Sequence, residues 1–83
     1  MDYKESYDYF HKHFGKVMDY CSKNGITYSI EPAPEEDEGF IVEFKNRNRK
    51  VVHSRLIPEW MLTNDHVSRC NDAIIRILKI NLK

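Results

Sequence analysis

The sequence predicts an α+β fold, a two-layer sandwich in which a three-stranded antiparallel sheet carries two helices on one face. Apolar residues recur every three or four positions near both ends of the chain, which is the period of a helix. Between these segments they alternate with polar residues, which is the period of a half-buried strand. The 83 residues suffice for one small core but not for two, so we expect residues 1–83 to form a single domain in the order α-β-β-β-α.

The first predicted element is a helix over about residues 3–24. Its apolar stripe consists of Tyr3, Tyr7, Phe10, Phe14, Val17 and Cys21. Gly25 can adopt the left-handed conformation that ends many helices. Gly15 lies inside the span at a cost of about 1 kcal/mol relative to alanine, and could mark the close approach of another backbone.

Three short strands are predicted after this helix. The first covers residues 26–31 and ends before Pro32, because proline has no amide proton for a ladder. The second covers 40–45, and a polar turn leads into the third, which spans about 50–57 and stops at Pro58. The face of the sheet without helices is expected to be open and mostly polar. It would hold Thr27, Ser29, Glu31, Ile41, Glu43 and Lys45.

The last helix follows a short apolar connector at 59–62. Thr63, Asn64 or Asp65 can cap its first turn, because each side chain offers an oxygen to the free amides there. Its apolar stripe is formed by Val67, Cys70, Ile74, Ile77 and Leu78. Packing both helical stripes on one face of the sheet is the simplest way to bury them.

This order of elements, over about residues 14–80, resembles that of double-stranded-RNA-binding domains. Such domains contact RNA with a lysine-rich start of their last helix and with the loop between their first two strands. In this chain those positions carry Asp65 and the acidic run 35–38, which phosphates would repel. The resemblance is therefore one of topology, and RNA binding is not inferred from it.

The composition excludes several classes of protein. Apolar residues make up 41% of the chain, which argues against disorder, and no apolar run approaches the ~20 residues of a membrane helix. The first residues lack the apolar stretch of a signal peptide, and two cysteines are too few for a disulfide scaffold. We therefore expect a cytoplasmic protein with reduced thiols. Abundant Lys, Asn, Ile and Tyr with scarce Ala and Gly favour an origin in a low-GC bacterium, its phages or its plasmids.

The net charge of zero conceals an uneven distribution of charge along the chain. Residues 1–43 hold four lysines and ten acidic residues, whereas residues 44–83 hold nine basic and three acidic residues. A fold that keeps the two halves apart would have an acidic and a basic pole. In the alternative, the halves interleave in space and their charges cancel.

Basic residues surround the turn between the second and third predicted strands. Their side chains could bind phosphates or the carboxylates of an acidic protein. In the alternative, they form a solvated turn that blunts an edge strand. The group consists of Lys45, Arg47, Arg49, Lys50 and Arg55.

The loop between the first and second predicted strands is acidic, with Glu35, Glu36, Asp37 and Glu38 in succession. Such a run could compete for the nucleic-acid-binding surface of a partner by mimicking a phosphate backbone. In the alternative, it is a solvated loop without a partner. It lacks the ligand spacing of a calcium-binding loop, so no cation site is predicted there.

Aromatic side chains on the first helix are more numerous than one narrow stripe can bury. Tyr3, Tyr7 and Tyr9 are candidates for a protein interface, and so is Trp60 in the connector. In the alternative, the tyrosines cap the edge of the core and Trp60 plugs it.

Metal-binding and nucleophile patterns are weak. His66 and Cys70 share a helix face as half of a zinc site, which Cys21 and either His53 or another histidine would have to complete. Packing of Cys21 and Cys70 as small hydrophobic residues accounts better for both. No glycine-rich phosphate loop or oxyanion-hole pattern is present, so we expect no catalytic residue, metal, cofactor or enzyme activity.

These features favour a small non-enzymatic binding protein that acts by contact with another protein. The concrete prediction is a phage- or mobile-element-encoded inhibitor of a host nucleic-acid-acting complex, such as a defence system. Its acidic loop or aromatic helix would block a basic channel. Nucleic-acid binding through the basic hairpin, as a regulator or accessory factor, is the second prediction. An immunity- or antitoxin-type binder is the third, and the oligomeric state stays open.

Overall fold

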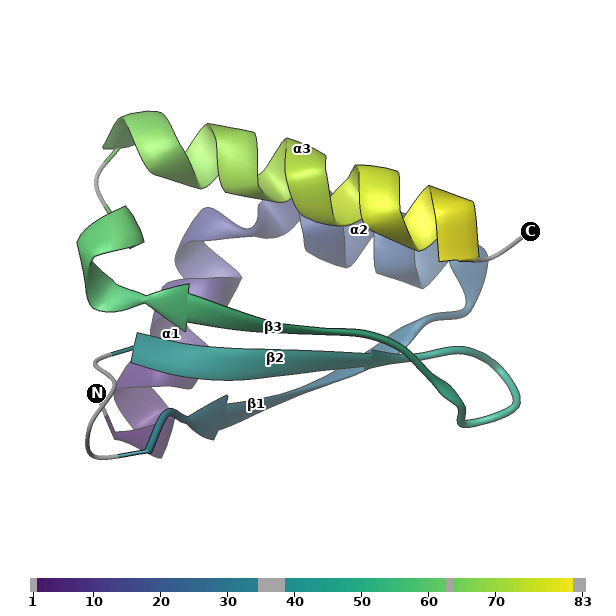
Figure 1. The fold of residues 1–83 in the computed structure, drawn as a ribbon, viewed down its shortest axis with the longest axis horizontal. Helices are drawn as coiled ribbons and strands as arrows, with labels where there is room; N and C mark the ends of the chain where they lie inside the picture. The colour runs from purple at the N-terminus through teal and green to yellow at the C-terminus, as the bar shows by residue number, and fades with distance from the viewer. Residues whose placement is uncertain (1, 35–38, 63, 82–83) are drawn as a thin grey trace.

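A computed structural model of the chain describes residues 2–34, 39–62 and 64–81 and confirms the α+β class (Figure 1). Its elements are α1 (Tyr3–His13), α2 (Gly15–Asn24), β1 (Thr27–Pro32), β2 (Gly39–Lys45), β3 (Val51–Pro58), the one-turn 3-10 helix η1 (Glu59–Leu62) and α3 (Asn64–Asn81). The strands match the predicted spans to within about one residue at each end, because alternation and the bounding prolines mark them in the sequence. The order is α-α-β-β-β-α, with one helix more than predicted.

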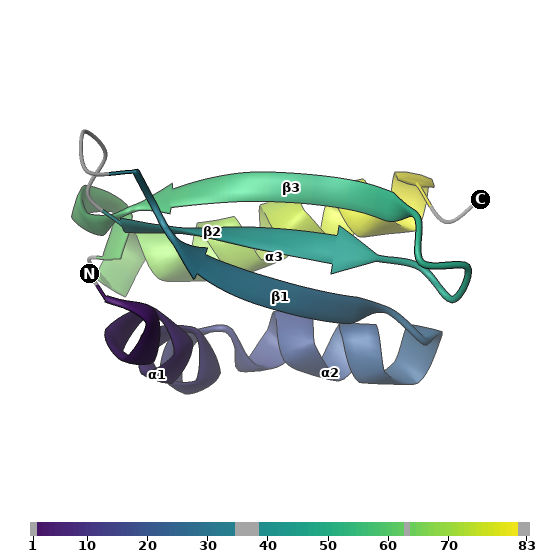
Figure 2. The same cartoon turned by 90° about the horizontal axis from the view of Figure 1, so that it is seen from below.

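The three strands form an antiparallel meander with β2 in the centre and with β1 and β3 at the edges. All three helices lie on one face of this sheet (Figure 1 and Figure 2). That face carries the buried Phe40, Val42 and Phe44 of β2. The opposite face is open, as predicted. On it, β1 and β2 place Thr27, Ser29, Glu31, Ile41, Glu43 and Lys45.

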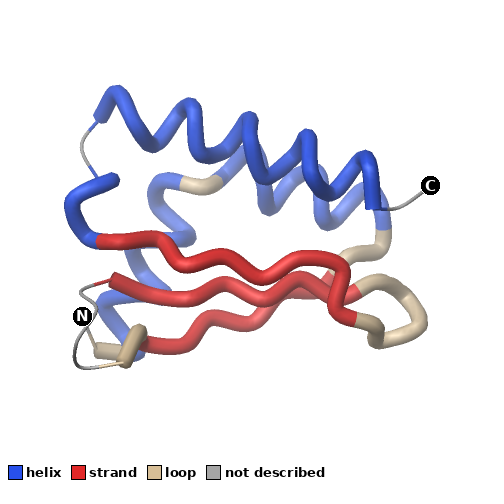
Figure 3. Tube along the Cα trace, in the orientation of Figure 1, coloured by secondary structure: helices blue, strands red, loops and turns tan. Residues whose placement is uncertain are grey.

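The first helix is not continuous, so the prediction of one helix over residues 3–24 is wrong. Phe14 leaves the helical conformation, with φ −113° and ψ 36°, and separates α1 from α2 (Figure 3). The break lets α1 pack over β1 while α2 lies beside α3. The apolar stripe does not reveal it, since Phe10 and Val17 are buried on either side. Gly15 begins α2, and a Cβ atom there would meet no heavy atom within 4 Å, so the close backbone approach considered above is absent at this residue.

Asn71 of α3 fills the gap that this break leaves in the hydrogen-bond ladder. In a continuous helix, the amide of Val17 would donate to the carbonyl of His13. Here the Val17 amide donates to Asn71 Oδ1 at 3.3 Å, and Asn71 Nδ2 donates to the carbonyl oxygen of His13 at 3.1 Å. Asn71 is only 3% exposed, so its side-chain amide replaces a backbone hydrogen bond inside the protein.

Aromatic rings form the centre of the core. Phe10 and Phe14 stack with their centroids 5.1 Å apart, and Phe40 meets both rings nearly at right angles, at 6.4 and 6.5 Å. The remaining buried residues of α2 and α3 are Val17, Cys21, Cys70, Asn71, Ile74 and Leu78. The predicted stripe of the last helix is thus confirmed at Cys70, Ile74 and Leu78, while Val67 and Ile77 are half-buried.

Candidate binding surfaces

The hairpin turn between β2 and β3 lies at one end of the molecule (Figure 1). Asn46 orders this turn, because its Oδ1 accepts hydrogen bonds from the amides of Asn48 at 2.9 Å and Lys50 at 3.0 Å. Arg49 adopts the left-handed conformation with φ 63°, which is uncommon for a residue with a long side chain. The side chains of Arg47, Arg49 and Lys50 are exposed at its tip.

The five predicted basic residues do not form one cluster. Lys45 is half-buried and pairs with Glu43 at 3.6 Å. Arg47 lies across the turn that follows α2, because its Nε, Cγ and Cζ atoms occupy the space where a Cβ atom of Gly25 would fall. Arg55 lies on the helix-covered face of β3 and is partly buried. Of the five, Arg55 is therefore the residue that the structure separates from the hairpin turn.

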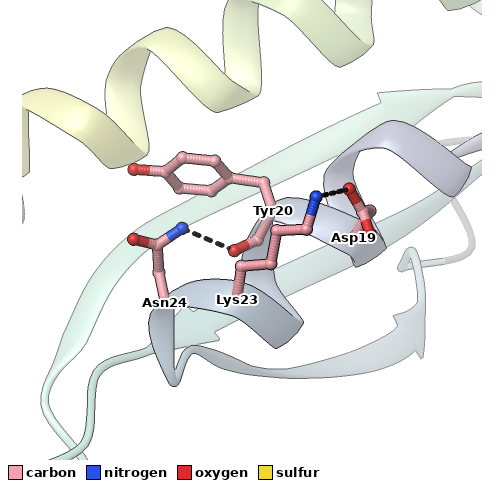
Figure 4. Close-up of polar contacts among 4 residues, drawn as sticks. All are labelled: Asp19, Tyr20, Lys23 and Asn24. Atoms are coloured by element: carbon pink, nitrogen blue, oxygen red, sulfur yellow. Dashed lines mark hydrogen bonds and ion pairs between the residues drawn. The ribbon is translucent and has the colours of Figure 1, made fainter.

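Two further cations lie at the same end, although they are far from the turn in sequence. Lys23, in the last turn of α2, pairs with the exposed Asp19 at 3.0 Å (Figure 4). Lys79, in the last turn of α3, lies 5.9 Å from the centroid of the Tyr20 ring, which points from α2 toward α3. We call the described cations of this part of the molecule the basic end. They are Lys23, Lys45, Arg47, Arg49, Lys50 and Lys79.

The opposite end of the molecule is acidic. The first turn of α1, the facing termini of β1 and β2, and η1 meet there (Figure 1). They carry Asp2, Glu5, Glu31 and Glu59, with Lys4 in the same turn of α1 as Glu5, and we call these four carboxylates the acidic end. Residues 35–38, the predicted acidic loop, lie outside the described residues. The longest extent of the chain is 33 Å, and the described charges of the two ends are separated along it.

Comparison with known proteins adds no functional assignment. No family model, curated protein or solved structure matches this chain. Within the described ranges, no helix is long and apolar enough to cross a membrane.

Three of the four predicted aromatic residues are exposed near the acidic end. Tyr3 and Tyr7 stack along α1 with centroids 6.3 Å apart, and are 58% and 43% exposed. Trp60 of η1 is 68% exposed and meets the ring of His66 edge-on at 6.0 Å, so it does not plug the core. Tyr9 is instead half-buried against the core, where burial raises the pKa of its hydroxyl.

A groove of about 330 Å³ lies between α1 and β1. Tyr3 and Tyr7 line it from the helix, and residues 28–31 line it from the strand. The hydroxyl of Tyr28 is 3.3 Å from Nε2 of His11. Burial raises the pKa of Tyr28, and the nearby Tyr7 and Cys21 raise it further. The groove thus joins the exposed tyrosines to the free edge of the sheet, an association that the sequence did not indicate.

The core contains two free thiols, Cys21 and Cys70. Burial raises the pKa of both, to about 11 for Cys21, so this thiol is protonated and a poor nucleophile at neutral pH. Among the residues that the structure describes, no three His, Cys, Asp or Glu side chains form a group that could hold a metal ion.

His53 of β3 is a half-buried titratable group whose Nε2 atom is buried. Its ring stacks on Phe44 with centroids 6.0 Å apart, and its buried Nε2 makes no hydrogen bond to the described part of the chain. Burial, and to a lesser degree the positive charge of Arg55, lower the pKa of His53 below its ordinary value of about 6.5. The folded protein therefore disfavours the protonated imidazole.

We expect acid to destabilise the protein through His53. The unfolded chain binds this proton near pH 6.5 and the folded chain only at lower pH, so the free energy of unfolding should fall as the pH drops below about 6.5. His53→Phe keeps a ring against Phe44 and should remove this part of the pH dependence. Urea denaturation of both proteins between about pH 7 and pH 5 measures it. Identical slopes of stability against pH would contradict the assignment.

Proposed function

We propose that the chain is a small binding protein whose acidic end contacts a basic surface of another protein. The observation that carries the proposal is the presence of carboxylates and exposed aromatic rings at the same end of the molecule. Tyr3 and Trp60 are both more than half exposed there, in the same elements as Glu5 and Glu59. Tyrosine and tryptophan frequently anchor protein interfaces, and neighbouring carboxylates favour a partner surface rich in arginine and lysine.

The concrete form of this proposal is inhibition of a complex that binds nucleic acid. Such complexes hold the phosphate backbone on surfaces lined with lysine and arginine. An acidic end with aromatic anchors could occupy such a surface and exclude the nucleic acid. The low-GC composition suits an origin in a phage or mobile element, and the buried thiols suit a reducing cytoplasm. An immunity-type binder would use the same surface on a different target.

The test is to capture the partner from a nuclease-treated lysate of a low-GC bacterium and then to measure its affinity for variants. Reversal of Glu5, Glu31 and Glu59, three carboxylates of the acidic end, to lysine should weaken binding at least about tenfold, because attraction to a basic surface becomes repulsion. A control with the same net charge reverses Asp19, Glu43 and Asp72, which lie outside the acidic end. Undiminished binding by the first variant would refute the phosphate-mimic mechanism.

The aromatic anchors are tested in the same assay. Tyr3→Ser combined with Trp60→Ser should also weaken binding at least about tenfold, since anchors of this type carry much of the energy of an interface. Val51→Ser combined with Ile80→Ser is the matched control, because it removes two exposed apolar side chains from the basic end. If the control pair weakens binding and the aromatic pair does not, the interface lies at the basic end and the proposal is wrong.

Nucleic-acid binding is the second candidate function, and the basic end favours it. There the hairpin turn and the last turns of α2 and α3 bring cations together. Arginine and lysine on such a surface bind phosphates with an affinity that falls steeply as salt rises. Material that is captured from the lysate but lost after nuclease treatment would favour this function over contact with a protein.

A further inference from the structure

The edge strand β1 carries backbone groups that the sheet does not use. The amide of Ala33 donates to the carbonyl oxygen of Gly39 at 3.2 Å, and these residues are directly opposite in the register of β1 and β2. In an antiparallel ladder, such bonded residues alternate with residues whose N–H and C=O groups point away from the partner strand. Tyr28 and Ile30 therefore direct both groups to the free edge. Pro32 agrees with this alternation, because its missing N–H falls at an outward position.

This edge lacks several features that protect edge strands. β1 pairs with β2 without a bulge and contains no lysine or arginine, and its charged residue and its proline, Glu31 and Pro32, are confined to its last two positions. It borders the groove lined by Tyr3 and Tyr7, and β1 is the strand nearest α1 in Figure 2. We propose that β1 pairs with β1 of a second copy of this chain, antiparallel across a two-fold axis, so that the two sheets become one continuous sheet.

A register centred on Ser29 satisfies all the outward groups of Tyr28 and Ile30. It pairs Tyr28 of one copy with Ile30 of the other, and each pair exchanges two hydrogen bonds across the new edge. Ser29 faces Ser29 of the second copy on the open face, where both side chains are small and exposed. The pairing therefore completes the ladder without burying a polar group that lacks a partner.

Charge complementarity favours the same arrangement. β1 begins at the basic end and finishes at the acidic end, so an antiparallel partner places its acidic end beside the basic end of the first copy. Glu31 of one copy would lie opposite Thr27 of the other, which is the register neighbour of Lys45. Two-fold symmetry repeats this contact, so both junctions bring opposite charges together.

The other edge strand, β3, is less suited to pairing with itself. It forms an irregular pair with β2 near its start, and the carbonyl of Val52 already accepts a hydrogen bond from Asn81 Nδ2 at 2.6 Å. The alternation that places Tyr28 outward also places Ser54 and Leu56 outward on β3. The register that pairs those two residues sets Arg55 opposite Arg55 of the second copy, and directly opposed like charges destabilise a sheet.

Disulfide trapping tests the proposal. In the proposed dimer, the two residues at position 29 form a non-hydrogen-bonded pair with Cα atoms about 4.5 Å apart, a distance that a disulfide can span. Ser29→Cys should therefore give a covalent dimer under mild oxidation. Ser54→Cys is the matched control, because Ser54 is also an exposed serine but lies on the other edge strand. The native thiols Cys21 and Cys70 are buried and do not compete.

We expect Ser29→Cys to form the dimer at least about tenfold faster than Ser54→Cys at equal concentration. Added salt should slow it, because the charged ends attract each other less. Sedimentation of the unaltered chain should show a mass that rises from 9.9 kDa toward twice that value with concentration. Equal rates for the two variants, or an unaltered chain that stays monomeric up to about 1 mM, would overturn the proposal.

Discussion

Replacing Asn71 with leucine is expected to lower the free energy of unfolding by about 2–4 kcal/mol. The two side chains have similar volumes, but leucine offers neither an acceptor to the Val17 amide nor a donor to the His13 carbonyl. The Val17 amide would then be buried without a partner, and the partly buried His13 carbonyl would lose its bond from Asn71 at the break between α1 and α2. A loss of this size is a large fraction of the stability of a small domain, and urea denaturation measures it directly.

Asn24→Leu is the matched control for this prediction. Asn24 Nδ2 also donates to a helix carbonyl, that of Tyr20 at 2.8 Å, but at the half-exposed end of α2 where water can replace the bond (Figure 4). The control should cost less than about 1 kcal/mol. Hydrogen exchange gives a second readout, because the Val17 amide should lose its protection only in the Asn71 variant. Equal losses in the two variants would show that the ladder closes without Asn71.

The break in the first helix also shows where prediction from the sequence ends. The strands and the last helix could be predicted because alternation, helical spacing and prolines are local signals. The residue that replaces the missing helical bond, Asn71, is 54 positions from Val17, and no local pattern connects them. An apolar stripe of constant spacing continues across Phe14, so periodicity predicts one helix where packing requires two.

The sequence could predict which segments carry charged or aromatic residues, but not which of these segments share one surface. Proximity in sequence grouped Arg55 with the hairpin cations, whereas the register of β3 turns it toward the helices. The same reasoning could not place Tyr3 and Trp60 at one end of the molecule, because that depends on α1 beginning at the end where η1 lies. Sequence patterns specify which face a residue takes within its element, and the topology then decides which elements share a surface.

The separation of charge has a structural effect besides any role in binding. α2 and α3 point from the acidic toward the basic end, whereas α1 runs largely across the long axis in Figure 1. Asp2 caps α1 by accepting a hydrogen bond from the Glu5 amide at 2.8 Å, and Lys23 and Lys79 lie in the last turns of α2 and α3. Charges placed in this sense each stabilise a helix by about 0.3–1 kcal/mol. Charge-reversal variants therefore need a stability measurement beside every binding measurement.

Gly39→Ala is expected to cost about 3 kcal/mol or more, enough to leave much of a small domain unfolded. Gly39 begins β2 with φ 130°, a conformation that residues with a side chain rarely adopt. A Cβ atom there would also overlap the carbonyl oxygen of Ile57 and the backbone of Pro58. Those atoms belong to the paired strand and its exit into η1, so they can move only by disturbing the pairing of β2 with β3.

The same chemical change at Gly15 should have the opposite sign, which makes it the control for Gly39. Gly15 is the first residue of α2 and has open space where a Cβ atom would lie. Alanine there restricts the unfolded chain and favours the helix, so Gly15→Ala should add about 0.5–1 kcal/mol and raise Tm by several degrees. Thermal denaturation followed by circular dichroism compares the two variants. Of these two glycines, Gly39 is the one whose surrounding backbone leaves no room for a Cβ atom. Equal effects of the two substitutions would therefore show that the β2–β3 junction is not the tight contact described above.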